Sequence, residues 1–166
     1  MPNKNYIRIQ FFAILFCVSV LLFSACSKDG TELVIPEIEQ PSGEQQTIEQ
    51  QVIDIVNRER SDAGLNKLQK DESLMTSCDV RAKELPIKLS HTRPDDTSWS
   101  TAITTTYSDA GENIASGYAS AEAVMVGWMN SLGHRNNILK KNYTHIGVGY
   151  YKQGGTSYWV QLFIRR

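Results

Sequence analysis

The sequence has little histidine or cysteine, and neither sign of charge dominates it. It holds 3 histidines and 3 cysteines in 166 residues. Its 17 basic and 18 acidic side chains give a formal net charge of −1. Nucleic-acid-binding proteins concentrate basic residues on one face, and this balance gives no sign of that. A chain of this length can bury the core of one medium-sized domain. We therefore expect one folded domain that does not bind nucleic acid.

Residues 1–25 lack an apolar run long enough to span a bilayer, and they have the layout of a secretory signal. Lys4 and Arg8 precede the apolar stretch, which ends at Ala25, whereas a spanning helix needs roughly 20 apolar residues. The stretch LFSAC resembles the lipobox of bacterial lipoproteins, which implies that Cys26 is acylated and becomes the mature N-terminus. A hydrophobic anchor that is not cleaved is the alternative. We expect a protein of the cell envelope, held to a membrane through Cys26 and facing outside the cytoplasm.

Residues 26–47 have the composition of a flexible acidic linker. This stretch is rich in Glu, Gln, Pro, Ser and Gly, so it cannot bury enough apolar surface to order itself. Its excess of acidic side chains and its prolines extend it further. The sequence therefore predicts three parts: a lipoprotein signal peptide at 1–25, a linker at 26–47, and a folded domain at 48–166 that stands away from the membrane.

The folded domain is expected to need no disulfide. Cys17 leaves with the signal and Cys26 carries the lipid, so Cys78 has no partner in the mature protein. Leu74, Cys78 and Ala82 recur at helical spacing, which favours a small core residue at Cys78. A nucleophilic cysteine is the sharper alternative, but no activating motif surrounds it.

The periodicity of the domain changes from helical to strand-like along the chain. Apolar residues at helical spacing predict helices over 48–64, 71–85 and 120–131. The last stretch, 145–166, alternates around a turn at 153–156 and predicts an antiparallel hairpin. Helices followed by a late hairpin indicate an α+β fold.

Polar motifs lie between these elements. They are SHTRPDD at 90–96, GENIA at 111–115, NSLGHRNNIL at 130–139 and HIGVGYY at 145–151, after an opening helix that contains VNRERSDAGLNKL. In this order and spacing the chain resembles the CAP superfamily of cysteine-rich secretory proteins, antigen 5 and pathogenesis-related 1 proteins. The resemblance implies an α/β/α sandwich, with a central antiparallel sheet between helical layers and a surface cleft.

In that family the cleft presents two histidines and two acids. The motifs match these to His91, Glu112 and His134, so the resemblance implies a ligand-binding cleft built from these three residues. The second acid is expected near the end of the third helix, where this chain has Asn130 and Ser131. The ligand set for a metal is therefore short of one carboxylate.

Two arrangements of the three cleft residues remain open. Two imidazoles and one carboxylate could bind zinc with one position left for water, with His91 and His134 as the metal ligands. The same residues could form a hydrogen-bonded cluster in which Glu112 orients a histidine, and without the second acid we favour this cluster with at most weak zinc binding. Ordinary loop histidines are the plainer alternative. His145 differs, because its place at the start of the hairpin favours packing at a strand edge.

Other polar residues give weaker signals for the same cleft. Arg93 and Arg135 could clamp a carboxylate or phosphate, and Ser131 is a further secondary candidate. Asn113 and Asn137 are expected to hold loops or helix ends. A structural ion pair is the commoner use of such arginines, and the expected partners are Asp95, Asp96 and Glu112.

Three functions are compatible with these residues. The first, which we favour, is a membrane-tethered module that presents the cleft to a lipid, peptide or glycan. The second is a hydrolase or metal-dependent enzyme that uses the same cleft, and the third is a structural or adhesion module with a vestigial cleft. The sequence holds no G-x-S-x-G, no H-E-x-x-H and no cysteine–histidine signature, so it leaves open whether the protein is an enzyme.

The lipid anchor can be tested by substitution. Cys26→Ser should abolish labelling by a fatty-acid analogue and leave an uncleaved precursor or a soluble exported form, because no other cysteine follows a run of small residues. Cys17→Ser is the matched control and should be labelled like the wild type. Unchanged labelling and membrane retention of the Cys26→Ser protein would contradict the prediction.

Overall fold

A computed structural model describes residues 46–166 of the chain. The predicted signal peptide, Cys26 and nearly all of the predicted linker lie outside the described residues. The division at residues 25 and 47 therefore stays a prediction. Within 46–166, no helix combines the length and the apolar character that a membrane span requires.

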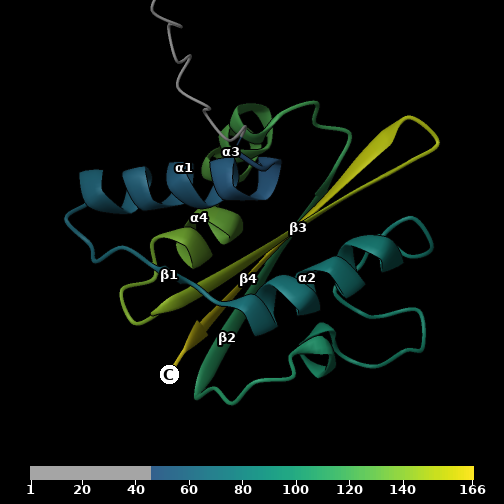
Figure 1. The fold of residues 1–166 in the computed structure, drawn as a ribbon, viewed down its shortest axis with the longest axis horizontal. Coiled ribbons are helices and arrows are strands. Elements are labelled where there is room, and N and C mark those ends of the chain that lie inside the picture. The colour runs from purple at the N-terminus through teal and green to yellow at the C-terminus, as the bar shows by residue number, and fades with distance from the viewer. Residues whose placement is uncertain (1–45) are drawn as a thin grey trace, which may run out of the picture. The chain divides into compact units, whose positions relative to one another are not determined.

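The described residues form four α-helices, one short 3-10 helix and four strands (Figure 1). The helices are α1 (Ile48–Asp62), α2 (Glu72–Glu84), α3 (Ala121–Asn130) and α4 (Leu132–Ile138), with the 3-10 helix at Trp99–Ala102. The strands are β1 (Gln69–Lys70), β2 (Asp109–Ser116), β3 (His145–Gln153) and β4 (Thr156–Arg165). The three helices and the hairpin that the periodicity predicts are thus confirmed.

The strands form one sheet in the order β1-β3-β4-β2. β4 pairs antiparallel with both β3 and β2, whereas the two-residue β1 pairs parallel with β3. The sheet is therefore mixed, and its three long strands are antiparallel. β2, which carries the GENIA motif, lies at the edge opposite β1.

Helices cover both faces of this sheet, as Figure 1 shows. Side chains of β4 alternate between the two faces. Trp159 and Phe163 pack in one core cluster with α1, α3 and α4, whereas Val160, Leu162 and Ile164 pack in a second cluster with α2. The α/β/α arrangement is confirmed.

Local signals fix where the predicted helices begin and end. Thr47, Asp71 and Ser120 cap α1, α2 and α3, each accepting a hydrogen bond from a backbone N–H in the first turn. Gly64 follows the end of α1 with φ of 71°, a left-handed conformation that glycine adopts without strain. The helix boundaries are therefore readable from the sequence to within about two residues.

One local expectation was wrong. The polar motif at 130–139 is expected to lie between the predicted helices and strands, but Leu132–Ile138 forms α4. The cause is tertiary: Ile138 is fully buried, and the buried guanidinium of Arg60 donates from Nη1 to the carbonyls of Ile138 at 2.8 Å and Lys140 at 3.0 Å. Contacts from α1 thus stabilise a helix end that the local sequence does not favour.

Close packing of α2 on β3 depends on two strand glycines. A Cβ at Gly147 would lie 2.5 Å from the backbone carbon of Leu74, and a Cβ at Gly149 would overlap the carbonyl of Cys78. Cys78 itself is completely buried, which confirms its prediction as a core residue. The sequence on β3 therefore sets how near α2 approaches the sheet.

This packing predicts a position-dependent effect of adding one methyl group. Gly149→Ala should lower the free energy of unfolding by about 1–3 kcal/mol, because the helix backbone must move. Gly133→Ala is the control: its Cβ meets nothing within 4 Å on α4, and alanine favours a helix. Urea denaturation measures both, and equal stability of the two variants would show that α2 does not pack as closely as described.

Candidate functional site

The predicted site residues gather around the edge strand β2. Glu112 pairs with Leu162 and Asn113 pairs with Gln161 across the β2–β4 ladder. Directly paired residues share a face, so Glu112 lies on the α2 side of the sheet and Asn113 on the other side. Two neighbouring residues of one strand therefore reach both helical layers.

Glu112 is a buried carboxylate with both oxygens engaged. Its side chain is 0% exposed; Oε1 accepts from Nε of Arg81 at 2.8 Å, and Oε2 lies 2.6 Å from Nδ1 of His91. A buried carboxylate is stable only when it is paired and hydrogen-bonded in this way. Glu112 thus links α2, β2 and the segment that carries His91.

Arg81 holds together the residues around Glu112. It is fully buried, and it also donates to Glu84 at 2.6 Å and to the backbone carbonyl of Ser90 at 2.8 Å. Burial lowers the pKa of Arg81, but the hydrogen bonds to Glu112 and Glu84 more than offset this effect, so the pKa lies above its ordinary value. The bond to Ser90 fixes the backbone immediately before His91.

Arg93 supports the same segment through a partner that the sequence did not identify. Its guanidinium contacts Glu84 from Nη2 at 2.7 Å and from Nε at 3.0 Å. The expected partners were wrong: Asp96 pairs with Lys88 at 2.7 Å, Asp95 accepts from Thr97, and Glu112 pairs with Arg81. Glu84 ends α2, and nothing in the local sequence shows that this helix end faces Arg93.

Glu84 therefore lies between two arginines. Burial raises its pKa, but hydrogen bonds from Arg93 and Arg81 outweigh burial and leave the pKa below its ordinary value. A carboxyl group with a lowered pKa stabilises the fold above its unfolded-state pKa, and this contribution is lost as the pH falls through the folded-state value. The segment that carries His91 is thus held by a charged network at neutral pH.

His91 presents one ring nitrogen to solvent. Its side chain is 55% exposed, and Nδ1 faces the Glu112 carboxylate. A carboxylate only accepts hydrogen bonds, so the proton of the neutral ring lies on Nδ1. Nε2 is then left as a free acceptor or metal ligand.

His134 approaches from the other layer, on α4. Its backbone carbonyl accepts from Nδ2 of Asn113 at 3.1 Å. Burial lowers the pKa of His134, and positive charge on the nearby His91 lowers it further. The structure thus places His91 in contact with Glu112 and His134 near enough to His91 for their charges to interact, and we call these three residues the histidine site.

A buried amide network joins α4 to β2. Asn137 donates to the carbonyl of Glu112 at 3.1 Å and to Oδ1 of Asn113 at 2.9 Å, and Asn113 donates to Oε1 of Gln161 at 2.9 Å. Asn113 and Gln161 are completely buried. Sequence reasoning assigned the asparagines to loops or helix ends and did not consider Gln161, because only the register of β2 on β4 reveals the network.

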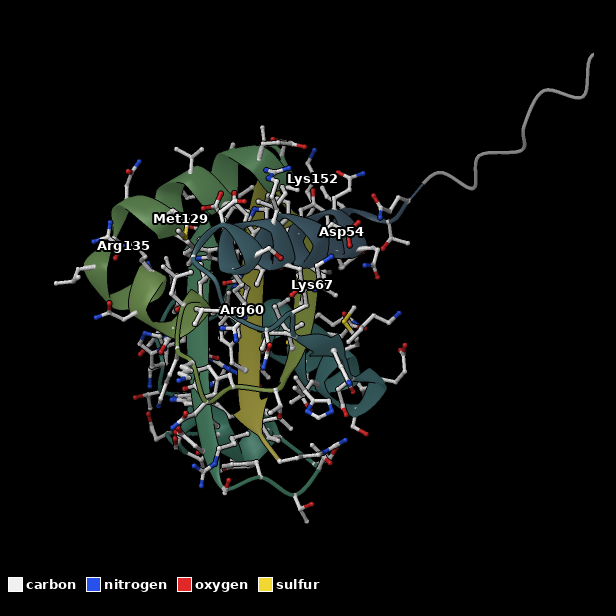
Figure 2. The ribbon with its side chains drawn as sticks, turned by 90° about the vertical axis from the view of Figure 1, so that its left-hand side faces the viewer. Asp54, Arg60, Lys67, Met129, Arg135 and Lys152 are labelled. Carbon is white, nitrogen blue, oxygen red and sulfur yellow. The ribbon has the colours of Figure 1, made fainter. Side chains whose placement is uncertain are left out.

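The secondary candidates lie close to the site without joining it. Ser131 precedes α4, and its side chain does not cap the helix. Arg135 is exposed on α4, where Figure 2 shows it pointing away from the domain. His145 begins β3, and its Nδ1 bonds to the neighbouring Thr144 hydroxyl at 2.8 Å, away from β2.

The residues present fit a metal only in part. Among residues 46–166, no group of three or more His, Cys, Asp or Glu side chains is arranged to hold an ion. Both oxygens of Glu112 are already hydrogen-bonded, which leaves the two imidazoles as ligands. Zinc binding by His91 and His134 therefore stays a prediction.

Comparison with known proteins supports the resemblance that the motifs carry. The sequence model of the cysteine-rich secretory protein family (CAP) matches residues 53–163. YkwD of Bacillus subtilis (strain 168) is 43% identical over 123 residues, which cover 70% of this chain and 46% of YkwD. The membrane protein YlbC of the same organism is 34% identical over 127 residues, which cover 74% of this chain and 36% of YlbC.

Solved structures give the same result. The crystal structure of an extracellular protein with an SCP domain from Bacillus anthracis str. Ames is 31% identical, with a TM-score of 0.65. The match covers 71% of this chain and 40% of that one. The chain thus spans less than half the length of these relatives.

The buried pair of Arg81 and Glu112 can be tested by a double-mutant cycle. Arg81→Met should lower the free energy of unfolding by about 3–5 kcal/mol, because it leaves the Glu112 carboxylate buried without its cation. Removing both charges, with Arg81→Met and Glu112→Leu together, should cost less than the two single changes summed. Chemical denaturation measures the cycle.

The matched control is Arg135→Met on the exposed face of α4, which should change the free energy of unfolding by less than about 0.5 kcal/mol. An effect of Arg81→Met as small as that of the control would mean that Glu112 does not depend on Arg81.

Proposed function

The chain belongs to the cysteine-rich secretory protein (CAP) family, and from this premise we propose that it is a membrane-anchored, extracytoplasmic binding module. In this proposal the histidine site is presented to a lipid, peptide or glycan, and Cys26 carries the anchor. The extracellular SCP-domain protein of Bacillus anthracis and the membrane protein YlbC support a place in the cell envelope.

The observation that carries the proposal is that the two carboxylate oxygens of Glu112 contact different residues. One oxygen is held by Arg81 and the other orients His91, so the carboxylate positions a histidine and is not itself free for a ligand. The groups left for a ligand are then Nε2 of the exposed His91 and the imidazole of the half-buried His134. Neutral imidazole nitrogens accept hydrogen bonds from hydroxyl and amide groups, which glycans and peptides supply.

A hydrolase is the second candidate, and the contact of 2.6 Å between His91 and Glu112 favours it. A carboxylate that orients a histidine is a common support for a general base. Within residues 46–166, however, no serine, threonine or cysteine side chain is hydrogen-bonded to His91 or His134. Burial raises the pKa of Cys78 well above its ordinary value, so this thiol is a poor nucleophile. Binding is therefore the simpler use of the site.

Native mass spectrometry of the full-length protein from its source tests the proposal. An organic ligand should travel with the wild type and be lost when His91 and His134 are both replaced by Ala. Lys152→Ala is the control, because it removes an exposed side chain on β3 outside the site, and it should retain the ligand. A ligand that the double variant retains would contradict a binding role for these two histidines. A hydrolysis product that the wild type forms and the double variant does not would also contradict it.

Zinc provides a second measurement on the same variants. With two imidazole ligands, we expect affinity at neutral pH to be micromolar or weaker, or about −8 kcal/mol at most. Binding should weaken as the pH falls and protons compete for the rings, and the lowered pKa of His134 keeps its ring available to a lower pH than usual. Calorimetry that shows tight, stoichiometric zinc binding in the His91→Ala, His134→Ala protein would overturn the assignment of these ligands.

A further inference from the structure

We infer that a second site, at the sheet edge opposite the histidine site, binds a phosphate ester. A cavity of about 390 Å³ lies beside β1, between the segment after α1 and the segment that leads into β3. We call it the basic pocket. The lining side chains that matter here are those of Asn66, Lys67, Gln69, Lys141, His145 and Arg166.

The pocket has cationic side chains that no carboxylate neutralises. Within residues 46–166, the salt bridges of lysine are Lys70 with Glu72, Lys88 with Asp96, and Lys140 with Asp109. Lys67 and Lys141, which line the pocket, have no such partner in this part of the chain. They come from segments more than 70 residues apart in sequence, so only the fold brings them to one cavity.

Arg166 adds to the pocket a guanidinium group that other side chains fix in place. Its Nη2 contacts Asp71 at 2.7 Å and the Thr105 hydroxyl at 2.5 Å. These contacts fix the group at the rim of the pocket and leave Nε and Nη1 without a partner among the described residues. Asp71 offsets the charge of Arg166, so Lys67 and Lys141 determine the positive sign of the pocket.

Neutral groups complete a lining suited to an oxyanion. The side-chain amides of Asn66 and Gln69 can donate hydrogen bonds into the cavity. The Thr144 hydroxyl is hydrogen-bonded to Nδ1 of His145 at 2.8 Å. This bond orients the His145 ring, and the other ring nitrogen, Nε2, donates to an oxyanion when it carries a proton.

The chemistry and the volume together indicate the ligand class. Lysine ammonium groups and amide donors bind phosphate oxygens well. A cavity of about 390 Å³ is within the range of small-molecule sites and exceeds the needs of a bare phosphate ion. A phosphate group on a soluble compound and one in a lipid headgroup share this chemistry.

Charge-neutralising variants of the full-length protein test the pocket. The probes are sn-glycerol 3-phosphate, a monoester, and glycerophosphoglycerol, the deacylated headgroup of phosphatidylglycerol. Isothermal calorimetry at low salt should show binding of at least one probe. Lys67→Gln with Lys141→Gln should weaken it by about tenfold or more, because two positive charges that low salt screens only weakly are removed.

The matched control removes two exposed lysines from other surfaces, with Lys83→Gln on α2 and Lys152→Gln on β3. Neither residue is among those that line the basic pocket. The control should bind like the wild type. Tighter binding of the monoester would identify a soluble phosphate as the ligand source, and tighter binding of the diester a lipid headgroup. Binding of neither probe, or equal weakening in both double variants, would overturn the inference.

Discussion

The buried contact between Arg81 and Glu112 is the interaction on which the rest of the histidine site depends. It joins the last turn of α2 to the edge strand β2 inside the protein, where neither charge is stable alone. Each member of this pair also fixes a group nearer the surface. Arg81 donates to the backbone carbonyl of Ser90, and Glu112 contacts the ring of His91. An exposed histidine thus has a fixed ring because the groups beneath it are buried.

The fold could be predicted from the sequence wherever local signals agree with the packing. Asp71 and Ser120 cap helices whose apolar residues recur at helical spacing, and the Gly154–Gly155 turn joins two alternating strands. The short helix α4 could not be predicted, because Ile138 and the guanidinium of Arg60 stabilise it from outside the segment. Its stability comes from tertiary contacts that a local pattern does not contain.

The residues of the histidine site also divide into those that the sequence identifies and those that it does not. The motifs identify His91, Glu112 and His134 through their resemblance to the CAP family. They do not identify Arg81, which reads as one more charged residue on an amphipathic helix, or Glu84, which reads as a solvated helix end. Both are defined by partners distant in sequence. The missing information is therefore the set of contacts that fix the site, and not the chemical groups that it exposes.

The position of the site follows from the alternation of an edge strand. Glu112 faces α2 and Asn113 faces α4, so one peptide unit of β2 connects both helical layers. A central strand could hold two layers as well, but neighbouring strands would cover it on both sides, whereas an edge leaves one side open. Asn137 and Gln161 satisfy the amide of Asn113, so α4 is fixed to this edge without added charge. The burial of polar groups on both faces of β2 is what allows the exposed His91 and the half-buried His134, which come from different layers, to lie near each other.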